Sequence, residues 1–175
     1  KKPNDVTVCI LNRPRHKEII EKLKNLNVNL RLIEDGDVSG ALLVIDEKHN
    51  VDLFLGIGGG PEGVLAASAL DAYNCNFQGR FIFKTEKDKL RASKMGIKDL
   101  NKKYELNEIV KGDSIFCATG ITDSIFIKGI TCNQDNYISE TLITHKNTNY
   151  KQLVKNVNSV NEWFLFLVKI GSNIK

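Results

Sequence analysis

The sequence has few of the residues that mark disulfide-rich and zinc-binding proteins. Its 175 residues include three prolines, one tryptophan and four cysteines, at Cys9, Cys75, Cys117 and Cys132. No two cysteines lie close enough in sequence to form one arm of a structural zinc site. We interpret Cys9 and Cys117 as small core residues, because both lie within apolar runs, and all four as reduced thiols.

Long apolar runs and clustered positive charge are also missing. No stretch reaches the roughly 18 residues of a membrane-spanning helix, and we find no secretory signal. The densest apolar segment, residues 162–170 (EWFLFLVKI), is expected to form a buried terminal strand or helix, or an edge that faces a partner. The net charge of +4 comes from dispersed lysines, which argues against a nucleic-acid partner. We expect no membrane partner and a cytoplasmic location, or a plastid one in a eukaryote.

The chain is long enough for one domain with its own hydrophobic core. We find no internal repeat and no linker that would divide it, so residues 1–175 are predicted to form a single domain. The chain begins with Lys1-Lys2-Pro3-Asn4, without an initiating Met, and a predicted strand follows almost at once. We interpret this start as that of a fragment or of a processed product of a longer chain.

Apolar runs typical of strands alternate with amphipathic stretches typical of helices. This alternation predicts an α/β fold, a layered sandwich with a largely parallel or mixed sheet flanked by helices. From residue 137 onward the pattern fits two strands, or a strand and a helix. Residues 38–45 are expected to form a short helix or an apolar segment. The predicted strands are 6–11, 28–33, 51–57, 79–84 and 114–118, and the predicted helices are 16–26, 62–73, 86–95 and a short one at 106–110.

Four of the predicted strands end in polar or glycine-rich turns. Ligands bind beyond the carboxyl ends of the strands in open parallel sheets, so we expect these turns to converge on one edge. Arginine matches phosphate oxygens, carboxylates accept hydrogen bonds from sugar hydroxyls or bind a divalent cation, and glycine allows close backbone approach. Each turn alone is ordinary turn chemistry, but together they predict a site for a phosphorylated, polyhydroxylated ligand. The turns are residues 12–15, 34–37, 56–62 and 119–123.

The glycine run also fits a dinucleotide-binding motif. Gly58, Gly60 and Gly63 match G-x-G-x-x-G between a predicted strand and a predicted helix, and Glu86 lies where a ribose-binding acid would be expected. Glu62 would place negative charge at the pyrophosphate position, and Pro61 removes a backbone donor there. A carboxylate at this point suits a metal cation better than a phosphate, but an NAD-binding domain stays open as an alternative.

Six segments of the chain form a series of linked motifs: NRPRH (12–16), LIEDGDVSGAL (32–42), GIGGGPEGVLAASAL (56–70), FQGR (77–80), RASKMGIKDL (91–100) and GDSIFCATGITDS (112–124). In their order and spacing they resemble class II fructose-1,6-bisphosphatase, of the inositol-monophosphatase-like sugar phosphatase superfamily. Several linked motifs are far more specific than any one of them. The resemblance covers the chain to about residue 130 and is loose beyond it.

The resemblance implies roles for individual residues. In the family, basic residues of the first turn contact substrate phosphate, two acids of the next turn bind the sugar, and the glycine run adds a backbone contact. The glutamate after the proline binds a metal. The family usually has Lys where this chain has Arg13, which keeps the charge and changes its geometry. The implied substrate contacts are Arg13, Arg15, Asp35, Gly36, Asp37 and Gly59, and the implied metal ligand is Glu62.

The resemblance further implies a hydrolase of carbohydrate metabolism, in gluconeogenesis and glycerol metabolism. The family removes the 1-phosphate of fructose 1,6-bisphosphate, in some members also that of sedoheptulose 1,7-bisphosphate, with Mg²⁺ or Mn²⁺. Its remaining metal ligands and its catalytic residues lie in an N-terminal half that is absent here. We therefore expect a C-terminal substrate-binding half that is inactive alone, partners its N-terminal half and forms a homo-oligomer. A non-catalytic sugar-phosphate sensor is the other open reading.

Overall fold

The structure is a computed structural model that describes residues 1–159. The chain forms two compact units, Lys1–Ser114 and Ile115–Lys175, the second of which is described up to Ser159. The apolar segment 162–170 lies outside the described residues, and the single-domain assignment stays a prediction. Within the described part of the chain, no helix is long and apolar enough to cross a membrane.

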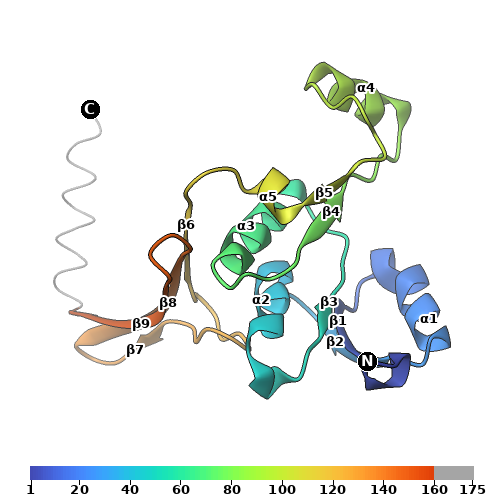
Figure 1. The fold of residues 1–175 in the computed structure, drawn as a ribbon. Coiled ribbons are helices and arrows are strands. Elements are labelled where there is room, and N and C mark those ends of the chain that lie inside the picture. Colours follow the sequence, from blue (N-terminus) through green and yellow to red (C-terminus); the bar gives the residue numbers. More distant parts are fainter. Residues whose placement is uncertain (160–175) are drawn as a thin grey trace. The chain divides into compact units, whose positions relative to one another are not determined.

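A three-stranded parallel sheet forms the centre of the first unit (Figure 1). Its strands are β1 (Thr7–Leu11), β2 (Asn29–Ile33) and β3 (Leu53–Phe54), in the order β2-β1-β3. Helix α1 (Lys17–Asn25) connects β1 to β2, and α2 (Asp37–Leu42) follows β2. The β-α-β-α-β order confirms the predicted alternation, although β3 is much shorter than the predicted strand 51–57.

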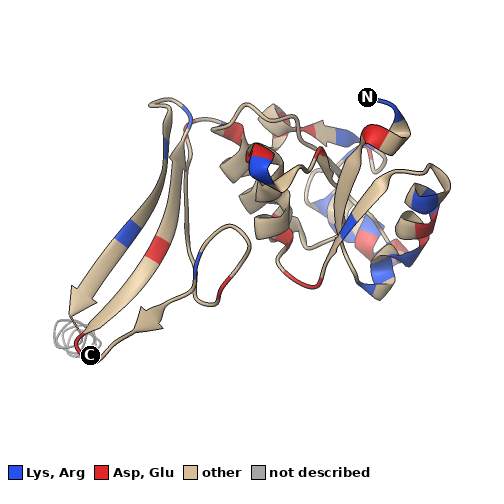
Figure 2. Cartoon of the chain, turned by 90° about the horizontal axis from the view of Figure 1, so that it is seen from below, with Lys and Arg blue, Asp and Glu red and all other residues tan. Residues whose placement is uncertain are grey.

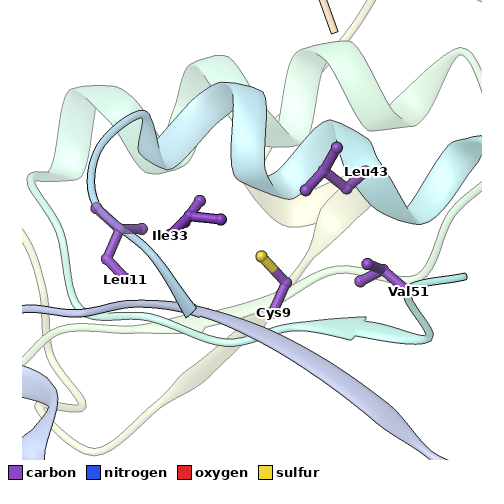
Figure 3. Packing of buried hydrophobic residues seen from close by; sticks show 5 residues of the cluster. All are labelled: Cys9, Leu11, Ile33, Leu43 and Val51. Atoms are coloured by element: carbon purple, nitrogen blue, oxygen red, sulfur yellow. The ribbon is translucent and has the colours of Figure 1, made fainter. Parts of the chain in front are cut away.

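Side chains of β1 alternate between the two faces of the sheet, as the two-residue period of a strand requires. Cys9 and Leu11 point to one face, where they pack with Ile33, Leu43 and Val51 below α2 (Figure 3). Burial raises the pKa of the Cys9 thiol, so this cysteine is a core residue, as predicted, and not a reactive one.

The opposite face of the sheet is covered by α1. Val8 and Ile10 pack there against Ile20 and Leu23, which lie on the buried side of that helix. The two clusters make this sheet the middle layer between α1 and α2. The amphipathic pattern of residues 16–26 therefore predicted the helix and most of the face it buries, although Leu26, which follows the helix, is exposed.

The outward face of α1 carries charges of both signs. Figure 2 shows basic and acidic residues interleaved along this helix. Lys22 pairs with Glu18 at 2.6 Å and Lys24 pairs with Glu21 at 2.9 Å, the spacing at which helical side chains meet. These exposed pairs balance the charge of the helix surface and contribute little to stability.

The rest of the first unit consists of short helices and strands that follow β3 in the chain. Helix α3 packs against α2, and β4 pairs with β5 in a separate antiparallel ribbon. Strand β4 ends at Arg80, so residues 81–84 of the predicted strand lie outside it. The elements are α3 (Gly60–Asp71), β4 (Gln78–Arg80), α4 (Glu86–Lys94), β5 (Lys103–Glu105) and α5 (Leu106–Ile109), with single turns of 3-10 helix at Pro3–Asp5, Pro14–His16, Leu43–Ile45 and Glu47–His49.

The second unit is an antiparallel sheet in its described part. It contains the long hairpin of β8 (Asn136–His145) and β9 (Tyr150–Ser159), which agrees with two strands as far as Ser159; the rest of the predicted second segment, residues 160–169, lies outside the described residues. On its other edge, β8 pairs with β6 (Ile115–Thr119) and with the short β7 (Thr131–Cys132). Parallel and antiparallel sheets flanked by helices confirm the α/β class with mixed pairing. Parallel pairing is found, among the described residues, only in β2-β1-β3.

Strand β6 departs from the sequence-based expectation of a buried strand. Phe116 is buried, whereas Ile115 and Cys117 on the other face of the strand are exposed. The interpretation of Cys117 as a core residue was therefore wrong. An apolar run alone does not distinguish a strand buried on both faces from one buried on a single face. Among the described residues no disulfide forms, which agrees with the reduced-thiol interpretation.

Candidate functional site

The three parallel strands bring three of the predicted turns to one edge of their sheet. Residues 12–15 follow β1, residues 34–37 follow β2, and residues 55–59 lead from β3 into α3. The fourth predicted turn, residues 119–123, follows β6, which belongs to the antiparallel sheet of the other unit. The expectation that all four turns end at one sheet edge was therefore wrong for this last turn.

The side-chain contacts beyond the ends of β1 and β2 keep the numbering offset of the paired strands. Leu11 lies beside Ile33, so residues that differ by 22 in number are neighbours. The same offset relates the polar side chains of the two turns, which sets each basic or amide group opposite an acid. The contacts are Asn12 Nδ2 to Glu34 Oε1 at 3.1 Å, Arg13 to Asp35 at 3.5 Å, and Arg15 to Asp37 at 3.7 Å.

These two arginine–aspartate pairs are loose and accessible. The side chains of Arg13 and Arg15 are 41% and 42% exposed, and Asp35 is 91% exposed, whereas Asp37 is 27% exposed. Ion pairs of this length and exposure contribute little to the free energy of folding, because water competes for both partners. A phosphate can therefore replace either aspartate beside its arginine, which leaves that carboxylate free to accept hydrogen bonds from hydroxyl groups.

The turn after β2 depends on Gly36. Its φ of +88° lies in the left-handed region, which glycine occupies without steric cost. The Gly36 N–H donates to Asp35 Oδ1 at 2.9 Å, and its carbonyl accepts from the N–H of Gly40 as α2 begins. Gly36 thereby sends Asp35 and Asp37 to the same edge from either side of a sharp bend.

The glycine run carries the backbone past two carboxylates. A Cβ on Gly58 would lie 3.3 Å from Asp37 Oδ1, and one on Gly59 would lie 2.2 Å from Glu62 Oε2. The Glu62 carboxylate therefore occupies the space that a side chain at position 59 would take. Glu62 itself lies in the first turn of α3, where the helix dipole favours negative charge.

Arg15 and His16 both hold the residue that precedes the glycine run. Arg15 Nε donates to the carbonyl oxygen of Ile57, and His16 Nε2 accepts from the Ile57 N–H at 2.8 Å. His16 Nδ1 lies 2.8 Å from the carbonyl oxygen of Leu11, and the residue is fully buried. Sequence reasoning assigned His16 no role at the site. Its helical spacing from Ile20 and Leu23 was the signal that it faces inward.

The described residues contain no group of three or more His, Cys, Asp or Glu side chains that could hold a metal ion. Glu62 is exposed and offers carboxylate oxygen, the donor that Mg²⁺ and Mn²⁺ prefer. It fits one ligand of such a site and not a complete site.

The environment of Glu86 does not match that of a ribose-binding acid. Glu86 is the first residue of α4, six positions beyond the end of β4, and β4 pairs antiparallel with β5. A dinucleotide fold requires a parallel strand that ends next to this acid. The GxGxxG match thus lacks the structural context that the dinucleotide-binding alternative needs.

Comparison with known proteins identifies relatives along nearly the whole described chain. Residues 1–159 match the family described as bacterial fructose-1,6-bisphosphatase, glpX-encoded. The chain is 31% identical over 166 residues to a D-fructose 1,6-bisphosphatase class 2/sedoheptulose 1,7-bisphosphatase of Synechocystis, a match that covers 87% of this chain and 48% of that protein.

Two further relatives have similar coverage. An enzyme of the same name from Trichodesmium erythraeum is 30% identical over 171 residues, which is 90% of this chain and 50% of that protein. A fructose-1,6-bisphosphatase class 2 of Haemophilus influenzae is 32% identical over 181 aligned residues, which is 95% of this chain and 54% of that protein. The chain thus spans about half the length of the curated relatives it matches.

Proposed function

The chain belongs to the glpX-type family of class II fructose-1,6-bisphosphatases, and we propose that it supplies the substrate-binding part of a sugar-bisphosphate 1-phosphatase. The observation that carries this proposal is the pair of contacts that sets two arginines opposite two aspartates, in the turns after the paired strands β1 and β2. Such a set suits a ligand that is both anionic and rich in hydroxyl groups. The substrate is fructose 1,6-bisphosphate, which would be converted to fructose 6-phosphate, and sedoheptulose 1,7-bisphosphate is a second candidate.

Arg13 and Arg15 are the residues proposed to bind phosphate. Their guanidinium groups are partly exposed and present several N–H donors in a plane, the geometry that phosphate oxygens accept best. Arg15 is anchored through its Nε to the Ile57 carbonyl, which leaves its terminal nitrogens for the ligand. Within residues 1–159, the side chain of Arg13 makes no comparable hydrogen bond to the backbone and only the exposed contact with Asp35, so it can follow the phosphate as the ligand enters.

The turn after β2 and the glycine run are proposed to bind the sugar. Asp35 and Asp37 become hydroxyl acceptors once the arginines turn to phosphate, and the Gly36 bend holds them at the same edge. Gly59 presents backbone without a side chain, so a sugar can approach it closely. These contacts orient the ligand, and the groups that cleave it are expected in the other half of the protein.

Glu62 is proposed as one ligand of Mg²⁺ or Mn²⁺, which agrees with the metal dependence of this phosphatase family. When bound, such an ion supplies charge to the phosphate and lowers the pKa of a bound water. Among the described residues, Glu62, whose carboxylate lies beside Gly59, is the ligand that we propose. The N-terminal half of the same enzyme is the expected source of the other ligands, and a cytoplasmic homo-oligomer is the proposed assembly.

The test is phosphate release from fructose 1,6-bisphosphate with Mn²⁺, measured for the full-length gene product and for the 175-residue chain. We expect activity in the full-length protein only. There, Arg13→Ala should raise KM about tenfold or more, the effect of losing a hydrogen bond to a charged group. Lys22→Ala removes the same charge from the exposed face of α1 and serves as the control, with an unchanged KM.

Three results would contradict the proposal. Hydrolysis by the 175-residue chain alone would show that the catalytic groups lie within it. Equal effects of Arg13→Ala and Lys22→Ala would show that only net charge matters at this edge. Sugar phosphate binding without hydrolysis by the full-length protein would favour the sensor reading instead.

A further inference from the structure

We propose that His16 is a positioning residue, one that fixes the glycine run against the turn after β1 and so sets substrate affinity; this inference rests on the function proposed above. His16 is fully buried, and both of its ring nitrogens lie within 2.8 Å of backbone partners. Those partners belong to different parts of the site, since Leu11 ends β1 and Ile57 leads into the glycine run. The imidazole therefore bridges two chain segments that share no backbone ladder at this point.

The partners of the two ring nitrogens fit one tautomer. A carbonyl oxygen can only accept, so Nδ1 donates to the Leu11 carbonyl at 2.8 Å, while Nε2 lies 2.8 Å from the Ile57 nitrogen, whose N–H donates to it, and 3.1 Å from the Ile57 carbonyl oxygen. In this tautomer the ring satisfies the Leu11 carbonyl and the Ile57 N–H at once. The Ile57 N–H is part-buried, and leaving it without a partner would cost free energy, so the bond to His16 holds this peptide in one position.

Arg15 links this bond to the substrate. The carbonyl of the same residue, Ile57, accepts from Arg15 Nε, so one residue is held by two adjacent side chains of the first turn. If Ile57 moves, the anchor of the Arg15 guanidinium moves with it. Gly58 and Gly59 follow directly in the chain, so their backbone moves as well. His16 thereby acts on the ligand through Arg15 and the glycine run, without contact of its own.

Two amide variants separate this role from simple core filling. In His16→Gln the side-chain oxygen reaches the position of Nε2 and can accept from Ile57 N–H. In His16→Asn the shorter amide reaches only the position of Nδ1, so the bond to Leu11 is kept and the bond to Ile57 is lost. Both variants replace a buried ring with a smaller polar group, and both are expected to lower stability by similar amounts.

The experiment measures KM and kcat for fructose 1,6-bisphosphate in the full-length protein, together with urea unfolding and hydrogen exchange of the Ile57 amide. We expect His16→Asn to raise KM about tenfold and to speed Ile57 exchange, and His16→Gln to stay within about threefold of the unmodified protein in KM. The tenfold value corresponds to one hydrogen bond of ordinary strength.

The outcomes are distinct. If both variants change KM equally, or if KM follows stability alone, His16 is a core residue and the inference is wrong. If Ile57 exchange is fast in the unmodified protein, the bond to Nε2 does not exist and the inference is also wrong. If the unmodified protein neither binds nor hydrolyses the sugar bisphosphate, the proposed function fails, and the role of His16 fails with it.

Discussion

Replacing Gly59 with alanine would test whether the glycine run exists to make room for the Glu62 carboxylate. An alanine Cβ at this position would lie 2.2 Å from Glu62 Oε2, and an ordinary contact begins at 3.4 Å, so the carboxylate must retreat by about 1.2 Å. The Glu62 side chain can yield at low cost because only its far end is affected. A displacement of about 1 Å at a reacting centre can lower a rate about a hundredfold.

We therefore expect Gly59→Ala to lower Mn²⁺-dependent phosphate release by the full-length protein roughly ten- to a hundredfold, as shifts of metal-ligand geometry do. The fold should persist. The φ of −70° and ψ of 152° at Gly59 suit alanine, and loss of glycine at the first position before α3 costs at most about 1 kcal/mol. The unfolding free energy, measured in urea, separates this small cost from the loss of activity.

Gly63→Ala supplies the matched control. Gly63 lies in the same helix with no atom within 4 Å of its would-be Cβ, so alanine should stabilise α3 by roughly 0.8–1 kcal/mol and leave activity unchanged. Glu62→Gln keeps the size of the side chain and removes its charge, and should lower activity by orders of magnitude. If Gly59→Ala is fully active while Glu62→Gln is inactive, the absence of a side chain at position 59 is not needed to make room for the Glu62 carboxylate.

Two further predictions concern stability. Gly36→Ala should lower the unfolding free energy by about 1–2 kcal/mol in urea denaturation, because alanine at a φ of +88° is strained, and unchanged stability would show that the bend relaxes. The Thr85 hydroxyl, which donates to Asp88 in the capping box of α4, holds the pKa of Asp88 below its usual 3.8. Since the pKa is lower in the folded state, this contribution is present above about pH 4 and lost as pH falls through the folded pKa. The Thr85→Ala variant lacks this contribution at every pH, so the amide protection of α4 should fall less on acidification than in the unmodified protein. Amide exchange measured at descending pH follows this protection. An equal fall in both proteins would contradict the capping argument.

Local patterns were sufficient to locate most helices. Residues 16–26 and 86–95 were predicted as helices, and the structure places α1 at Lys17–Asn25 and α4 at Glu86–Lys94. Helical hydrogen bonds connect residues four apart, so the signals for a helix are contained within the segment that forms it. The same reasoning predicted α3, where Pro61 lies in the first turn.

Strands were harder, because their extent depends on partners elsewhere in the chain. Strand β3 covers two residues of the seven-residue apolar run 51–57, and β5 was not predicted at all. The same dependence on distant partners explains why the sequence did not predict that Cys117 is exposed or that β6 belongs to a second, antiparallel sheet. An apolar run shows that a strand can be buried, and only the paired strand and the layer packed on it decide whether it is.

The sequence by itself determined the chemistry of the site: which turns carry arginine, aspartate and glycine, and in what order they follow the strands. Only the tertiary structure decided which of these groups meet. The 22-residue offset between Arg13 and Asp35 comes from the pairing of β1 with β2, and the bond from Ile57 to His16 joins residues 41 apart in sequence. Register and long-range hydrogen bonds are set when whole elements pack, because a one-residue slip would turn every buried side chain of a strand to the wrong face.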